Sequence, residues 1–327
     1  MDSTDIDTPQ PLPGWLSEAA RRLRTITGFI TVQPNGGDVR TLAFSRYDHV
    51  ARVASLALAT NNDRSVPRSE VILISWLHDI NRWPFAHNAE GDRFDQPGDI
   101  ERFVAGRLPL RSVRQAAGVA GKNLPVLDKA ARVVLLADMV TGFVEDTLFA
   151  VTGLGLSPSE LPGQTLDLLR MPVGDSDFLE ELVYLHDLLN LKLDVPGYIR
   201  NFNSLVHRAS LRFLAEHDFT DHRALEDDNF WIVRTALRNE YLPVYIFPLN
   251  NEKVCHGTLI RRALVDPVLC RLGEAGQSNL TRWSEADFVA YALKEKLITE
   301  DTIFTVAPTL DYIQRFEPHR SLTLLHA

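Results

Sequence analysis

The stretch "ILISWLHDINRWPFAHNAE", residues 72–90, ends an apolar run with the adjacent residues His78 and Asp79. Ionisable side chains at the end of a buried segment are costly unless they are paired or bind a metal. Neutral imidazole and carboxylate together suit Fe, Mn, Co, Ni or Zn. Adjacent residues of a regular helix point about 100° apart, so we expect the pair at a helix end, which Pro84 favours because proline stops helix continuation.

Two further ligand-type residues stand alone among apolar neighbours. His49 lies in "SRYDHVARVASLALAT" and Asp138 lies in "VVLLADMVTGF". Both segments have the apolar spacing of helices that face a core. Convergence of these helices on one ion would explain four polar residues at once, so we predict one divalent transition metal held by His49, His78, Asp79 and Asp138.

The elements that must position these ligands are predicted to be mainly helices. Ser45, with Asp48 three residues later, is typical of a helix N-terminus. Residues 33–41 and 91–99 read as loops, and Leu242–Ile260 is the one segment where a β-hairpin competes with a helix, because Asn250-Asn251 could form its turn. The helices are expected at residues 14–29, 45–60, 66–80, 99–108, 110–121, 125–151, 178–193, 196–217 and 229–241, and again in the last part of the chain.

The length and composition of the chain are those of an ordinary globular protein. The chain has 327 residues, of which 45% are hydrophobic and 24% are charged. Its net charge of -9 argues against sequence-blind nucleic-acid binding, which usually needs a basic surface. Two cysteines give neither a disulfide framework nor a cysteine zinc motif. No signal peptide and no membrane span are recognisable, so we expect a cytoplasmic protein without membrane contact.

The order His, His-Asp, Asp resembles the motif of the HD-domain metal-dependent phosphohydrolases over about a third of the chain. The resemblance is closest to the deoxynucleotide triphosphohydrolase branch, in which an Arg precedes the first His by three residues, as Arg46 does here. It implies an HD-type helical bundle over residues 15–220, after a flexible arm at 1–14 and before a mainly helical extension of unknown role at 221–327. A homo-oligomer is expected by resemblance alone.

The segment after the His-Asp pair both matches and departs from that branch. Pro84, Phe85 and His87 match its Gly-His-x-Pro-Phe-x-His pattern, whereas Asn81 and Arg82 stand where it has Gly and His. A phosphatase acting on mono- or diphosphates is therefore as good an expectation as a triphosphohydrolase. In some members another Asp follows the last ligand by eight residues, which is Asp146 here.

The resemblance implies hydrolysis of a phosphate ester or anhydride in a nucleotide or similar small molecule. Arg46 and Arg82 would grip the phosphate, because guanidinium matches phosphate bidentately. Lys122 and Lys129 are weaker candidates for that task. His87 or Glu90 would be the general acid, and the sequence does not choose between them.

Two other functions compete with hydrolysis. An HD-type iron oxygenase would need further His ligands between the pair and the last Asp, where only His87 is available. A non-catalytic module that senses a nucleotide is the other, because Arg82 at a family His position could remove turnover and leave binding. A second dipeptide, His186-Asp187, lies mid-helix with no later ligand pattern, so we do not expect it to bind metal.

Overall fold

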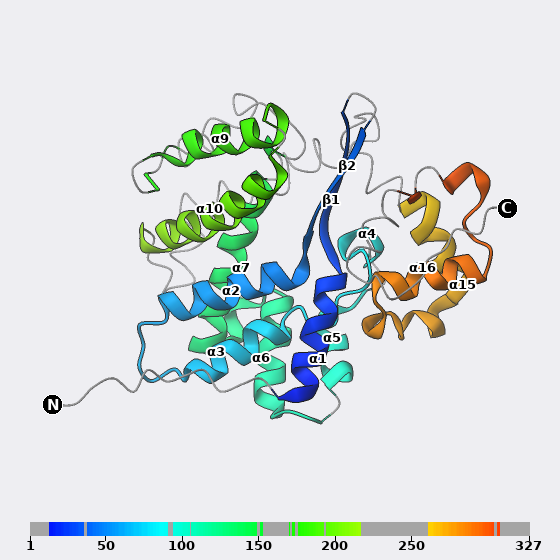
Figure 1. Ribbon diagram of the computed structural model, residues 1–327. Coiled ribbons are helices and arrows are strands. Elements are labelled where there is room, and N and C mark those ends of the chain that lie inside the picture. Colours follow the sequence, from blue (N-terminus) through cyan, green and yellow to red (C-terminus); the bar gives the residue numbers. More distant parts are fainter. Residues whose placement is uncertain are drawn as a thin grey trace.

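The computed structural model shows a mainly helical chain, which confirms the predicted fold class (Figure 1). It describes residues 13–35, 38–90, 94–104, 106–148, 151–152, 170, 172–173, 176–192, 194–216, 261–303 and 306–307. Most of the predicted arm and the expected hairpin at Leu242–Ile260 lie outside the described residues.

A bundle of helices carries the predicted ligands. The helices α2, α3, α6 and α7 pack against one another around one apolar core, and α10 lies against α2 and α7. The helices are α1 (Gly14–Arg22), α2 (Arg46–Thr60), α3 (Arg68–Leu77), α4 (His87–Glu90), α5 (Gln96–Val104), α6 (Leu110–Ala120), α7 (Lys129–Leu148), α9 (Phe178–Asn190), α10 (Val195–Glu216), α15 (Asp266–Gln277) and α16 (Glu285–Lys294).

A β-hairpin lies where the sequence predicted a helix end and a loop. Strands β1 (Thr27–Asn35) and β2 (Asp38–Ser45) pair antiparallel, with Asn35 opposite Asp38, and project from the bundle in Figure 1. Two signals favour the hairpin: β-branched residues near the start of β1, and Gly36-Gly37 between the strands, a frequent hairpin dipeptide. Consequently α1 ends at Arg22, where a short 3₁₀ turn (Leu23–Thr25) leads into β1.

The other helix boundaries are close to prediction, with two corrections. The helix predicted from Pro125 begins only at Lys129, because residues Leu124–Val126 form a 3₁₀ turn and Leu127 is extended. The loop predicted at 91–99 is shorter, since α5 begins at Gln96.

Ser45 caps the helix that carries His49, as predicted. Its hydroxyl oxygen accepts a hydrogen bond from the Asp48 backbone N–H at 3.2 Å and donates to Asp48 Oδ2 at 2.7 Å. We expect Ser45→Ala to lower the free energy of unfolding by about 1 kcal/mol, the usual value for a lost N-cap. Urea unfolding measures it, with exposed Ser69→Ala in α3 as the control. An unchanged midpoint for Ser45→Ala would show that the cap contributes nothing.

A second apolar cluster joins the C-terminal helices to the segment that follows the His-Asp pair. Phe85 and Phe288 are fully buried and meet edge to face, with ring centroids 5.5 Å apart. The Phe85 backbone N–H also donates to Glu285 Oε1 at 3.1 Å. Residues 83–89 are therefore held by α15 and α16, although they directly follow the bundle in sequence.

None of the helices within the described ranges is both long enough and apolar enough to cross a lipid bilayer.

Candidate metal centre

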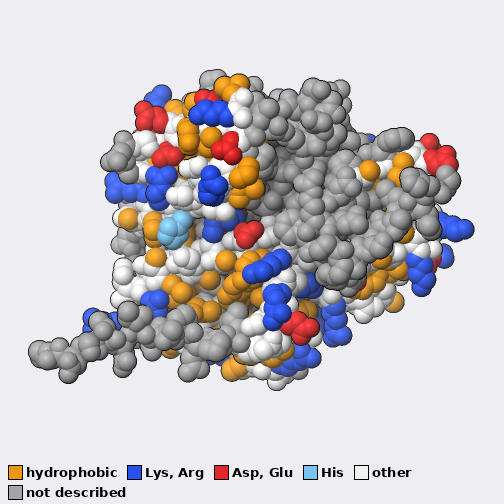
Figure 2. Space-filling view, in the orientation of Figure 1, with side chains coloured by type: hydrophobic (Ala, Val, Ile, Leu, Met, Phe, Trp, Pro, Cys, Tyr) orange, Lys and Arg blue, Asp and Glu red, His pale blue; other side chains and the backbone are white. Residues whose placement is uncertain are grey.

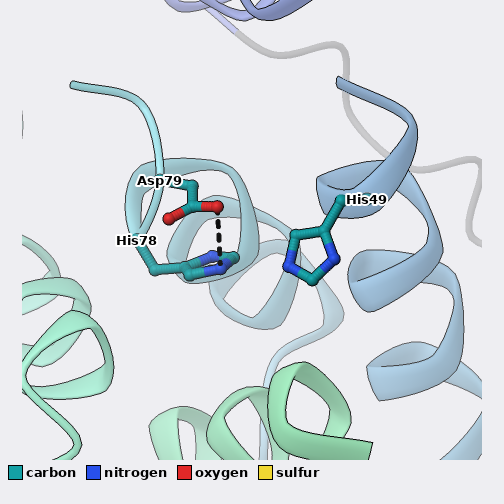
Figure 3. Close-up of side chains that lie close together, drawn as sticks. All are labelled: His49, His78 and Asp79. Atoms are coloured by element: carbon teal, nitrogen blue, oxygen red, sulfur yellow. Dashed lines mark ion pairs between the residues drawn. The ribbon is translucent and has the colours of Figure 1, made fainter. Parts of the chain in front are cut away.

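Three elements bring the predicted ligands together. His49 projects from α2 toward His78 and Asp79, which follow the last residue of α3 (Figure 3). One ligand atom from each of the three lies within 4.8 Å of the others, and all three residues are buried. Asp138 approaches from α7, with Oδ1 3.0 Å from His49 Nε2 and 3.7 Å from His78 Nε2. Three of the predicted ligands therefore form one cluster, and the fourth, Asp138, contacts both of its histidines.

The end of α3 orients His78 as a ligand. Because His78 is the C-cap residue, the chain can turn after it, and the two adjacent side chains reach the same centre. Its Nδ1 lies 2.6 Å from the Ser75 carbonyl oxygen, so Nδ1 carries the hydrogen that this bond needs. In a neutral imidazole Nε2 is then the lone-pair nitrogen; this atom is buried and has no hydrogen-bond partner within the described part of the chain. A buried acceptor of this kind fits a metal ligand whose other nitrogen is fixed.

His49 is held by the carboxylate of Glu145, which was not among the predicted site residues. Glu145 Oε2 lies 2.7 Å from His49 Nδ1, and Glu145 Oε1 accepts a hydrogen bond from Arg52 Nε at 2.7 Å. Glu145 stands two helical turns after Asp138, so both face the same side of α7. That spacing was the available signal, but the resemblance pointed to its neighbour Asp146. This carboxylate–imidazole pair leaves His49 Nε2 directed at the centre.

These charges shift the pKa values of His49 and Glu145. Burial alone would lower the pKa of His49, but Glu145 and Asp138 outweigh burial and raise that pKa to about 9. Burial alone would raise the pKa of Glu145, but Arg52 and His49 lower it to about 2. In the metal-free protein at neutral pH, His49 is therefore an imidazolium between two carboxylates.

Asp79 is surrounded by donors. Arg46 Nη2 bonds to its Oδ2, Arg82 Nε donates to its Oδ1 at 2.8 Å, and Gln96 Nε2 donates to Oδ1 at 2.9 Å. Gln96 also donates to the His78 carbonyl oxygen at 2.7 Å, which fixes the backbone between the two ligands. Burial would raise the pKa of Asp79, but the two guanidinium groups hold it well below its usual range. Asp79 is thus an anion at neutral pH, as a ligand must be.

The predicted phosphate-binding arginines both lie at the centre. Arg46 is buried, and its Nε has no hydrogen-bond partner among the described residues, so its guanidinium has a donor to spare. Arg82 is held at its second edge by Glu90, with Nη1 2.6 Å from Oε2. Asp79 and Glu90 raise the pKa of Arg82 against the effect of burial, so it stays charged.

Of the two predicted general acids, only the side chain of Glu90 lies within the described residues. Glu90 is buried, and its carboxylate accepts from Arg82 and from the Trp83 backbone N–H at 3.3 Å. This arrangement makes Glu90 a residue that positions Arg82, rather than a free proton donor. His87 begins α4, but its side chain lies outside the described residues. The role of His87 stays a prediction, and so does the two-iron alternative that depends on it.

The two predicted lysines are not placed at the centre. Lys129 is exposed and pairs with Asp63 at 2.7 Å. It begins α7, nine residues before Asp138, which corresponds to about 13 Å along the helix axis. Lys129 thus lies away from the ligands and is paired with Asp63, and its role in phosphate binding stays a prediction. Lys122 is exposed just after α6, with a positive φ of 54°.

A cavity of about 440 Å³ lies beside the ligands. Arg82 and Gln96, which both touch Asp79, form part of its wall together with Glu90 and Phe94. Small-molecule sites usually have this size and combine apolar surface with a few polar groups. A substrate-sized space thus begins one side chain away from Asp79.

Comparison with protein-family models, with curated proteins and with solved structures finds no match for this chain. The assignment of the centre therefore depends on its own residues and geometry.

We expect metal uptake to depend on pH because of the charge state of His49. Because its pKa is about 9, a metal that binds Nε2 below that pH must displace a proton. We expect release of about one proton per ion at pH 7, and metal affinity that rises with pH until about 9. Calorimetric titration of EDTA-stripped protein with Mn²⁺, in buffers of different ionisation enthalpy, measures the release. Heats that are independent of the buffer would contradict this charge state.

Proposed function

We propose that this chain is a metal-dependent phosphohydrolase that cleaves a phosphate ester or anhydride of a nucleotide or similar phosphorylated small molecule. The observation that supports the proposal is the buried Nε2 of His78, which has no hydrogen-bond partner among the described residues and lies 3.8 Å from Asp79 and 3.7 Å from Asp138, beside His49. Two imidazoles and two carboxylates are a donor set that suits Fe, Mn, Co, Ni or Zn.

A bound divalent metal would contribute to hydrolysis in two ways. A divalent ion held by these four residues would polarise a phosphate oxygen and lower the pKa of a bound water. The protein's part is to orient the two histidines and to keep Asp79 ionised. Ser75 fixes the tautomer of His78, Glu145 orients His49, and Arg46 and Arg82 keep Asp79 ionised.

The arginines supply the second half of the proposal. Phosphate carries charge on several oxygens, and guanidinium groups bind it with paired hydrogen bonds. Arg46 has a buried Nε without a hydrogen-bond partner among the residues that the structure describes, and Arg82 lies between Asp79 and the neighbouring cavity. A phosphate in this cavity would contact Arg82, which the bond to Glu90 holds in place. This arrangement favours an anionic substrate despite the chain's net charge of -9.

Release of phosphate and pyrophosphate from a panel of nucleotides and sugar phosphates tests the function. The full chain would be assayed with Mn²⁺, Co²⁺ or Fe²⁺, beside His78→Ala. His186→Ala is the matched control, because it alters the other His-Asp dipeptide, which lies half-exposed on α9. We expect release that disappears in His78→Ala and persists in His186→Ala. Nucleotide binding without any release would instead favour the non-catalytic sensing module, and equal release from both variants would rule out this centre.

A further inference from the structure

A second cavity lies apart from the metal centre, between parts of the chain that are distant in sequence. Its volume is about 490 Å³, and its walls come from α1, the link between α5 and α6, and the start of α16. Figure 1 shows α1 between the bundle and the C-terminal helices α15 and α16. None of the four predicted ligands contributes to its lining, which includes Trp15, Arg22, Phe103, Arg107, Arg282 and Asp287.

Basic groups exceed acidic groups in this lining. Three arginines face two acids, Glu18 and Asp287. Asp287 is already engaged as the capping partner of Ser284, whose backbone N–H and hydroxyl both donate to it, at 2.8 and 3.0 Å. Arg107 and Arg282 are exposed and have no carboxylate partner among the described residues. Figure 2 shows basic side chains gathered near acidic ones on the face where Figure 1 places α1. On a chain with net charge -9 such unpaired cations favour an anionic ligand.

The cavity also offers flat apolar surface. Trp15 and Phe103 are both partly buried, so each presents some ring surface to the cavity. The Arg107 guanidinium lies over the Trp15 ring, 5.5 Å from its centroid. A planar group can stack on an aromatic ring or on a guanidinium plane. The lining therefore suits a ligand that combines a flat ring with a negative charge.

Arg22 makes one wall of this cavity rigid. Its Nη1 donates to the Trp283 carbonyl oxygen at 2.7 Å, and its Nη2 donates to the carbonyl oxygens of Ile80 at 3.0 Å and Arg82 at 2.8 Å. These bonds tie α1 to the C-terminal helices and to the backbone just after Asp79. A wall fixed in this way is formed before a ligand arrives, which reduces the cost of ordering on binding.

We propose that this cavity is a binding site for a small organic phosphate that carries a flat ring, separate from the metal centre. Arg107 and Arg282 would hold the anion, and Trp15 and Phe103 would hold the ring. The inference does not depend on the phosphohydrolase proposal, because it uses none of that centre's ligands.

Adenosine 5′-monophosphate, adenosine and inorganic phosphate are suitable probes, titrated calorimetrically into the full chain with EDTA present to weaken phosphate binding at the metal centre. We expect the monophosphate to bind more tightly than either fragment. The double variant Arg107→Ala/Arg282→Ala should weaken its binding at least about 10-fold, since two charge-assisted contacts are lost. Arg114→Ala is the matched control, because Arg114 is exposed on α6 and does not line the cavity; it should bind as the wild type does.

Three results would overturn the proposal. The first is no binding of the monophosphate to the wild type. The second is unchanged binding to the double variant, which would place the ligand elsewhere, for example at the metal centre. The third is equal affinity for inorganic phosphate and the monophosphate, which would show that no ring is recognised. Phosphate release by the double variant is measured separately. A failure of ligand binding in this cavity can then be told apart from a failure of the catalytic function.

Discussion

Asp79→Asn is expected to abolish metal retention and to lower the free energy of unfolding of the metal-free protein by about 3–5 kcal/mol, the usual cost of removing one partner of a buried ion pair. The substitution keeps the shape of the side chain and removes its charge. Arg46 and Arg82 would then face each other across a neutral amide, and both are largely buried. The amide also replaces one acceptor oxygen with an NH₂ donor. Arg46, Arg82 and Gln96 already direct donors at this side chain.

Metal content after dialysis and urea unfolding in EDTA measure the two effects of Asp79→Asn. Asp187→Asn is the control, because Asp187 is half-exposed and follows a His in the same way. If Asp79→Asn does not fold, Asp138→Asn serves instead, since Asp138 contacts His49 and His78 and is partly exposed. Full metal retention by a folded variant of either ligand would contradict its assignment.

Glu145→Gln is expected to weaken metal affinity by about 10- to 100-fold, as is usual for partners that orient a ligating histidine. The amide can still accept a hydrogen bond from His49 Nδ1, but it no longer supplies the charge that favours this orientation. It also leaves Arg52 without its carboxylate, so the link from Arg52 to Asn203 on α10 is expected to loosen. Competition for Zn²⁺ or Co²⁺ against a coloured chelator measures the affinity.

The adjacent residue provides the control for this prediction. Asp146→Asn removes a carboxylate from the same turn of α7, but the side chain of Asp146 starts about 100° further around the helix. We expect Asp146→Asn to bind metal as the wild type does. Equal losses in the two variants would indicate a general effect of charge on α7, and no loss in Glu145→Gln would show that His49 needs no such partner.

The cluster of predicted ligands was largely predictable because these residues interrupt strong helical patterns. His49 and Asp138 each stand alone among apolar residues, and the geometry of a helix end required the turn that follows His78. Glu145 was missed although its two-turn spacing from Asp138 marks the same helix face. Lys129 was a weak candidate on spacing alone, because nine residues of one helix separate it from Asp138.

The remaining features depend on contacts between distant parts of the chain. The bond from Arg22 to Trp283 joins residues 261 positions apart, and no local pattern predicts such a contact. The packing of Phe85 on Phe288 is equally non-local. The β1–β2 hairpin is different, because Gly36-Gly37 was a usable local signal that the helical pattern of the preceding segment concealed.

Elemental analysis of the purified full chain is the most direct test of metal binding by the predicted ligands. The protein would be expressed with mixed Fe, Mn, Co, Ni and Zn in the medium, purified without chelator and compared with His49→Ala and His78→Ala. We expect about one transition-metal ion per chain in the wild type and almost none in either variant, because each variant loses one of the four predicted ligands. A wild type without metal, or variants that retain it in full, would contradict the assignment of this centre.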